Sequence, residues 1–120
     1  MHGLDPATDL GPLIGATLTF VGIGQHQVQL HFSGEPDCAV SAEGEYSVRP
    51  VQEPLVRFAE PPEGASALVA LLGSHVERAE VLDAGTMRLT LNAGVVVEVY
   101  DSKAGYESYQ VTLGDRLIVV

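Results

Sequence analysis

Residues 27 to 32, Gln27-Val28-Gln29-Leu30-His31-Phe32, alternate strictly between polar and apolar side chains. Successive side chains of a β-strand point to opposite faces of a sheet, so this stretch predicts a strand with Val28, Leu30 and Phe32 facing a core. Met87 to Leu91 alternates in the same way. Both stretches therefore indicate half-buried strands of an antiparallel sheet.

The two alternating stretches belong to a longer pattern that occurs twice. Leu13-Ile14-Gly15 and Leu71-Leu72-Gly73 are each followed by apolar residues at positions +3, +6 and +8 from the glycine. A regular strand cannot direct both the +3 and the +6 side chains to one face, so a β-bulge is expected between them in both copies. The pattern predicts an internal repeat with halves at about 13–48 and 71–113. Chance matching among common apolar residues in two hairpins is the alternative interpretation.

The remaining elements are predicted from composition and from turn residues. A proline-rich crossover at 50–64 joins the halves and includes a short edge strand at Leu55–Phe58. Ala65–Leu72 is rich in helix formers and predicts a short helix that ends at Gly73, with Leu68, Leu71 and Leu72 on its core-facing side. Further strands are predicted at Thr17–Ile23, Ala39–Val48, Val76–Leu82, Val95–Tyr100, Tyr106–Leu113 and Arg116–Val120.

Together these elements predict a single domain over residues 1–120, of the α+β class and mainly β. About eight antiparallel strands would form two related meanders, arranged as a sandwich or an open barrel, with one short helix between them. The apolar stretch Leu117 to Val120 is expected to pair as a closing strand or to meet another subunit, because an exposed apolar edge invites aggregation. The predicted core consists of Leu18, Val28, Leu30, Phe32, Val40, Val76, Leu89, Leu91, Val97 and Val111.

Composition narrows the classes of function. The 120 residues are 46 % hydrophobic and 18 % charged, which is typical of a globular protein. The net charge of −10 argues against a nucleic-acid partner and against binding to an anionic membrane, since both need cationic side chains. The N-terminus has no basic, apolar signal sequence, and no stretch is apolar enough to span a bilayer. With a single cysteine, Cys38, the composition predicts a cytoplasmic protein.

The sequence contains no recognisable catalytic or metal-binding pattern. Its four histidines form neither HxH nor HExxH, and its serines lie outside any GxSxG turn. Cys38 follows Glu35-Pro36-Asp37, whose negative charges oppose the thiolate that a nucleophilic cysteine requires. We therefore predict that the protein is not an enzyme and uses no cofactor or metal.

Acidic residues are the first candidate site. Seven acidic residues and two arginines lie between Glu35 and Glu63. An acidic patch would attract a basic protein partner, whereas an ordinary solvated surface would only keep the protein soluble. The leading hypothesis is a non-catalytic binding protein, with neutralisation of a basic toxin or nuclease as its immunity-like form. The candidate partner-binding residues are Glu35, Asp37, Glu43 and Glu45.

The segment Tyr106-Glu107-Ser108-Tyr109-Gln110 is the second candidate. Tyrosine offers a large contact area with a polar tip, which suits either an anchor within a sheet or a binding surface. One alternative function is a small-ligand or enzymatic pocket between the two meanders that uses Tyr106, Glu107 and Tyr109. Another is a structural module that forms a homodimer through its edge strands.

Several short motifs carry a family resemblance: Leu71-Leu72-Gly73, Leu89-x-Leu91, Tyr106-Glu107-Ser108-Tyr109-Gln110 and the terminal apolar stretch. The sequence resembles small bacterial, largely actinobacterial, domains of unknown function that end in Tyr-Glu-Ser-(Trp or Tyr)-Gln before a short apolar strand. The likeness lies mainly in the second half of the chain. It implies a β-rich domain with an immunity-type or accessory binding role, and it implies no catalytic residues.

Overall fold

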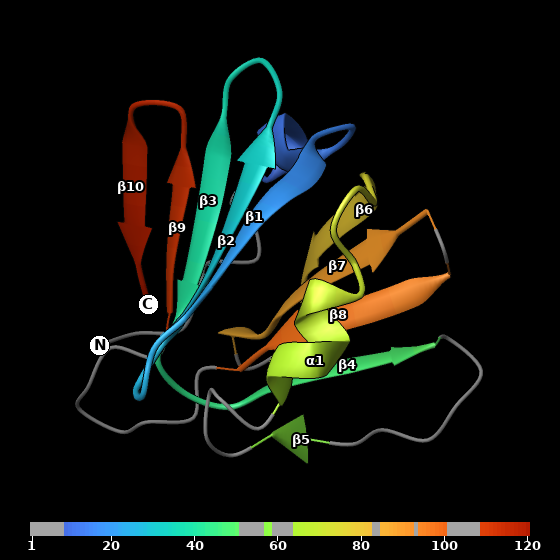
Figure 1. The fold of residues 1–120 in the computed structure, drawn as a ribbon. Helices are drawn as coiled ribbons and strands as arrows, with labels where there is room; N and C mark the ends of the chain where they lie inside the picture. The colour runs from blue at the N-terminus through green and yellow to red at the C-terminus, as the bar shows by residue number, and fades with distance from the viewer. Residues whose placement is uncertain (1–8, 51–56, 59–63, 83–84, 93, 101–108) are drawn as a thin grey trace.

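The computed structural model describes residues 9–50, 57–58, 64–82, 85–92, 94–100 and 109–120. Within these residues, two five-stranded antiparallel sheets are present, here named sheet A (order β1-β2-β3-β9-β10) and sheet B (order β5-β4-β8-β7-β6) (Figure 1). The strands are β1 (Thr17–Ile23), β2 (Val28–Ser33), β3 (Cys38–Ala42), β4 (Tyr46–Pro50), β5 (Arg57–Phe58), β6 (Val76–Val81), β7 (Met87–Leu91), β8 (Val95–Val99), β9 (Tyr109–Leu113) and β10 (Arg116–Val119). The helical elements are the 3-10 turn η1 (Gly11–Leu13) and the helix α1 (Ala65–Val69).

In each half of the chain, the first three strands form a meander in one sheet, and the next two strands belong to the other sheet. The strands β1, β2 and β3 are neighbours in sheet A, but β4 and β5 join sheet B beside β8. The second half mirrors this course, because β6, β7 and β8 are neighbours in sheet B while β9 and β10 join sheet A beside β3. The prediction of a mainly β fold with two antiparallel meanders is confirmed.

The exchange of strands corrects one predicted element. The stretch Ala39–Val48, predicted as one strand, is divided between β3 and β4 in different sheets. Ala42, Gly44 and Tyr46 are all buried, so the alternation of buried and accessible positions continues through the bend between the strands. Periodicity alone therefore could not reveal that the chain changes sheets there.

Both irregularities predicted from the glycine spacing are present. The register of β1 against β2 shifts between Leu18 and Phe20, and the register of β6 against β7 shifts between Val76 and Arg78. The shift lets Leu18 and Val21, or Val76 and Ala79, face the same core despite their odd spacing. The internal repeat over the two halves, at about 13–48 and 71–113, stays a prediction.

Reciprocal backbone hydrogen bonds join the two halves where β1 and β6 begin. The N–H of Gly15 donates to the carbonyl of Val76 at 2.7 Å, and the N–H of Gly73 donates to the carbonyl of Leu18 at 2.8 Å. Both glycines have a positive φ, +88° and +91°, which a residue without a side chain adopts without strain. These bonds connect an edge of sheet A to an edge of sheet B.

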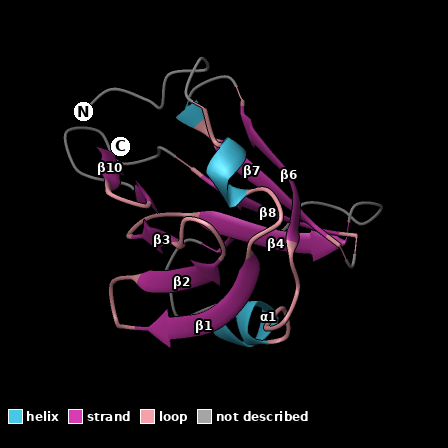
Figure 2. Ribbon diagram, turned by 90° about the horizontal axis from the view of Figure 1, so that it is seen from above, coloured by secondary structure: helices cyan, strands magenta, loops and turns pink. Residues whose placement is uncertain are grey.

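The core lies between the sheets, which form the two layers seen from above in Figure 2. All ten predicted core residues are buried. The sheets do not close into a barrel, because within the described residues β10 and β5 each end a sheet. The helix α1 is shorter than predicted and buries Leu68, with Leu71 buried just beyond it. Leu72, predicted to face the core, is 46 % exposed because the helix ends at Val69 and the chain turns towards Gly73.

Candidate functional site

The four carboxylates predicted as a partner-binding site do not form one patch. Glu35 and Asp37 are exposed in the turn before β3, whereas Glu43 and Glu45 are half-buried in the connection after it. The five residues of β3 that separate the two pairs span about 17 Å in an extended strand. The structure therefore places one acidic pair at each end of sheet A.

A further carboxylate strengthens the acidic end that precedes β3. The N–H of Gly114, in the turn between β9 and β10, donates to the carbonyl of Asp37 at 3.0 Å, so this turn lies against the β2–β3 turn. Asp115 follows in the same turn and is exposed. Asp37 also accepts a hydrogen bond from the N–H of Gly34 at 3.0 Å, which fixes the turn that carries Glu35.

The outward face of sheet A between these two ends carries no Asp, Glu, Lys or Arg. Strand alternation and the pairing register place on it the side chains that point away from the core, and we name this set the sheet A outer face. A soluble surface is normally about 25–35 % charged, so an uncharged face is unusual in a chain of net charge −10. Its residues are Thr17, Thr19, Phe20, Gly22, Gln29, His31, Ser33, Ala39, Ser41, Gln110, Thr112, Leu117 and Val119.

Apolar side chains lie at both margins of this face. Phe20 on β1 is 53 % exposed, and Leu117 and Val119 on β10 are 60 % and 38 % exposed. The register connects these margins in one row, since Phe20 pairs with His31, and Leu117 pairs with Thr112, across Ala39 in the centre. The ring of Phe20 meets the His31 ring edge-on, with 5.1 Å between the ring centroids.

A shallow hollow lies at each end of the sheet A outer face, and each has one predicted acidic residue in its wall. The hollow at the β2–β3 turn has a volume of about 410 Å³. The hollow at the β1–β2 turn has a volume of about 360 Å³. The first is lined by Thr19, Phe20, His31, Phe32, Ser33, Asp37 and Cys38. The second is lined by Gly24, Gln25, His26, Gln27 and Glu43.

Cys38 in the first hollow is poorly suited to nucleophilic chemistry. Burial raises the pKa of the Cys38 thiol, and the negative charge of Asp37 raises that pKa further, while a hydrogen bond from the Gly114 backbone partly opposes both effects. The Sγ atom lies 3.5 Å from the carbonyl of Pro36 and 3.7 Å from that of Pro12. The thiol is therefore protonated at neutral pH, and a protonated thiol is a poor nucleophile.

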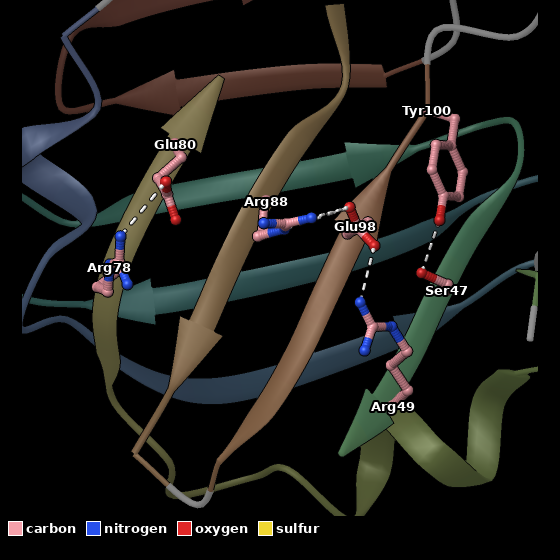
Figure 3. Close-up of polar contacts among 7 residues, drawn as sticks. All are labelled: Ser47, Arg49, Arg78, Glu80, Arg88, Glu98 and Tyr100. Atoms are coloured by element: carbon pink, nitrogen blue, oxygen red, sulfur yellow. Dashed lines mark hydrogen bonds and ion pairs between the residues drawn. The ribbon is translucent and has the colours of Figure 1, made fainter. Parts of the chain in front are cut away.

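The outward face of sheet B carries charged side chains, unlike the sheet A outer face. It contains a group of polar residues that the sequence analysis did not predict (Figure 3). Glu98 on β8 is only 6 % exposed and lies between two arginines. Its Oε2 atom is 3.3 Å from Nε and 3.2 Å from an Nη of Arg88, and its Oε1 atom is 3.9 Å from an Nη of Arg49. The sequence did contain a signal for this group. Glu98 is the single carboxylate within the valine run 95–99, and the preceding strand β7 carries Arg88 at an outward position.

The neighbouring polar side chains on sheet B also form hydrogen bonds with other residues of the protein. The hydroxyls of Ser47 and Tyr100 share a hydrogen bond of 2.9 Å, and both residues are buried. Both guanidinium groups are directed at Glu98, whose single carboxylate balances one of their two positive charges. The arrangement acts as a structural support for β8, because a buried carboxylate must be paired to remain charged.

Of the three candidate ligand-binding residues in the tyrosine segment, only Tyr109 belongs to the described residues. Tyr109 is fully buried, and its hydroxyl donates a hydrogen bond to the carbonyl of Gly85. Its side chain is thus a core anchor and is not accessible to a ligand in this conformation. Tyr106 and Glu107, the other two candidate ligand-binding residues, lie outside the described residues.

Neither a metal-binding cluster nor a membrane-spanning helix is present among the described residues. No group of three or more His, Cys, Asp or Glu side chains there is arranged to hold a metal ion. None of the helices in that part of the chain is both long and apolar enough to cross a bilayer.

Fold and site together define an antiparallel two-sheet β domain with one uncharged outer face that ends in acidic turns. Residues 10–120 match a family described as a family of unknown function, DUF6188. The chain belongs to this family, since the match covers nearly all of it. No curated protein and no solved structure matches the chain.

Proposed function

We propose that this domain is a non-catalytic protein-binding module that engages a basic protein partner through the sheet A outer face. The observation that carries the proposal is the absence of charged side chains from this face, in contrast to the arginines and glutamates on sheet B. Protein interfaces typically have a centre depleted of charged residues and a polar rim. The face between the two acidic ends has this composition.

The acidic ends define the chemistry of the partner. Asp37 and Glu43 each line a hollow at the margin of the face, where a lysine or arginine head group of a partner can be received. Phe20 lies in the wall of the first hollow and offers its ring to such a cation. The expected partner therefore has an uncharged contact surface with basic residues on two sides of it.

The biological setting is part of the same proposal. The C-terminal motif at 106–110 and its actinobacterial resemblance suggest a bacterial protein, and the composition suggests the cytoplasm. Neutralisation of a basic toxin or nuclease is the form of binding that the acidic ends favour. No catalytic step is assigned, because the carboxylate at the centre of sheet B is occupied by arginines and the Cys38 thiol is protonated.

The test is a quantitative pull-down from bacterial cytoplasm with the tagged full-length protein and two site variants. Phe20→Glu introduces a charge into the face, and the double variant Asp37→Asn, Glu43→Gln removes both charges while keeping an acceptor for Gly34. We expect a basic protein to be retained by the wild type at low salt and released at about 0.5 M salt, where charges are screened within about 4 Å. Both variants should lose this protein.

The matched control is the double variant Glu77→Gln, Glu80→Gln on β6, which removes the same amount of charge from the other sheet. This control should retain the partner at the wild-type level. The proposal is wrong if no basic protein depends on Phe20, Asp37 and Glu43, or if the β6 control loses the partner equally.

A further inference from the structure

The four edge strands of the two sheets differ in how well they are protected against pairing with another strand. A free edge presents unpaired backbone N–H and C=O groups, and proteins protect edges with bulges, charges or very short strands. The edges β1 and β6 both carry a bulge, and they bond to each other where they begin. The edge β6 also carries Glu77, Arg78 and Glu80, and β5 has only two residues.

The edge β10 has none of these protections after its first residue. Leu117, Ile118 and Val119 are apolar, and the register of β10 against β9 is regular. The outward side chains of Leu117 and Val119 are exposed, and among the described residues no strand pairs with the far side of β10. Within the part of the chain that the structure describes, this edge is therefore the open position of sheet A.

The hydrogen-bonding phase of β10 identifies which backbone groups face outward. Val120 and Tyr109 form a hydrogen-bonded pair, with the N–H of Val120 donating to the carbonyl of Tyr109 at 2.9 Å. Hydrogen-bonded and non-hydrogen-bonded pairs alternate along an antiparallel ladder, so Ile118 also bonds to β9. The N–H and C=O groups of Leu117 and Val119 consequently point away from β9, towards the open edge.

We infer that β10 pairs with β10 of a second copy of this chain, in an antiparallel register centred on Ile118. In this register, Leu117 of each copy lies opposite Val119 of the other, and their outward backbone groups bond to each other. The two copies of Ile118 lie opposite each other on the two-fold axis as a non-hydrogen-bonded pair. The arrangement is self-complementary, as a two-fold dimer requires.

The net charge restricts where two copies of the chain can approach each other. Two copies that each carry a net charge of −10 repel each other, so they approach most easily where charged side chains are absent. Leu117 to Val119 and the adjoining sheet A outer face meet this condition. Pairing by this edge would place the two outer faces side by side in one sheet, so a partner could meet both.

The small contact predicts a weak dimer. A pairing of such short strands buries less than the roughly 1,200–2,000 Å² of a stable interface, so the dissociation constant is expected in the micromolar range. Sedimentation velocity of the full-length chain between about 1 μM and 500 μM should show a concentration-dependent shift from monomer to dimer. A chain that is monomeric throughout this range would overturn the inference.

Two charge variants test the register. Leu117→Lys and Val119→Glu each place a charge opposite an apolar residue of the other copy, and each should weaken self-association roughly tenfold. Because Leu117 lies opposite Val119, a mixture of the two variants should dimerise more strongly than either variant alone. Both positions are exposed, so thermal unfolding should be nearly unchanged. Dimerisation that is unaffected by either charge, or mixtures that show no recovery, would contradict the inference.

Cysteine cross-linking gives a further measurement, in which a covalent bond retains even a weakly populated dimer. In a Cys38→Ala background, Ile118→Cys should form an intermolecular disulfide on mild oxidation, because opposite residues of a non-hydrogen-bonded pair lie about 4.5 Å apart between Cα atoms. Leu117→Cys is the matched control, since its two copies are diagonal in this register. Equal cross-linking at both positions would rule the register out. None of these three experiments involves the basic partner, so their results are independent of the proposed docking function.

Discussion

At the scale of single residues, Glu98 is a charged side chain that is almost excluded from solvent. It is almost fully buried, yet it remains paired with Arg88 and lies close to Arg49. Glu98→Gln should lower the free energy of unfolding by about 2 kcal/mol, because two partly buried guanidinium groups lose their counter-charge. Urea denaturation of the two proteins measures this difference.

Glu80→Gln is the natural comparison for Glu98→Gln. The Glu80 carboxylate is 3.5 Å from Arg78, but the side chains in this pair are 36 % and 69 % exposed. Exposed pairs contribute little, so this change should cost less than about 0.5 kcal/mol. Similar losses at both glutamates would show that burial does not decide the contribution of Glu98.

At the scale of elements, the two glycines at the start of β1 and β6 hold equivalent backbone conformations. A Cβ atom added at Gly15 or Gly73 would meet no atom within 4 Å, so only the positive φ opposes a substitution there. Gly15→Ala and Gly73→Ala should each destabilise the protein by about 1–2 kcal/mol, as expected for an L-residue in the left-handed region. Thermal or urea unfolding of the two variants should give nearly equal losses.

Gly24→Ala is a suitable control for the glycine pair, because the added Cβ atom would make an ordinary 3.4 Å contact and Gly24 does not have a positive φ. Its stability should lie close to that of the wild type. A marked difference between Gly15→Ala and Gly73→Ala would argue that the two halves are not equivalent at these positions.

At the scale of the whole molecule, the exchange of strands makes the two halves depend on each other. Each sheet combines three strands from one half with two from the other, and one core connects both. The full chain should therefore unfold in a single transition, with coincident curves from far-ultraviolet circular dichroism and tyrosine fluorescence. Separate transitions for the two probes would contradict this expectation.

A division of the chain between Pro62 and Glu63 tests the same dependence directly. Each fragment alone lacks two strands of the sheet that it mainly builds, so it should remain largely unfolded. An equimolar mixture should regain β-sheet signal as the exchanged strands pair again. Independent folding of either fragment would show that the strand exchange is not needed for stability.

The alternating stretches by themselves determined the β class, the two meanders and the core, because side-chain periodicity depends only on local strand geometry. The odd spacing after Gly15 and Gly73 likewise predicted both bulges before any contact was known. The acidic residues around β3 were recognisable as a group, but their separation to opposite ends of sheet A was not.

Only the tertiary structure decided which strands pair. The bend between β3 and β4 keeps the same alternation of buried positions, so nothing local distinguishes one long strand from two strands in different sheets. The uncharged outer face, the open edge of β10 and the burial of Tyr109 also depend on partners distant in sequence. Local periodicity specifies which side of a strand is apolar, whereas long-range pairing specifies which surface that strand helps to build.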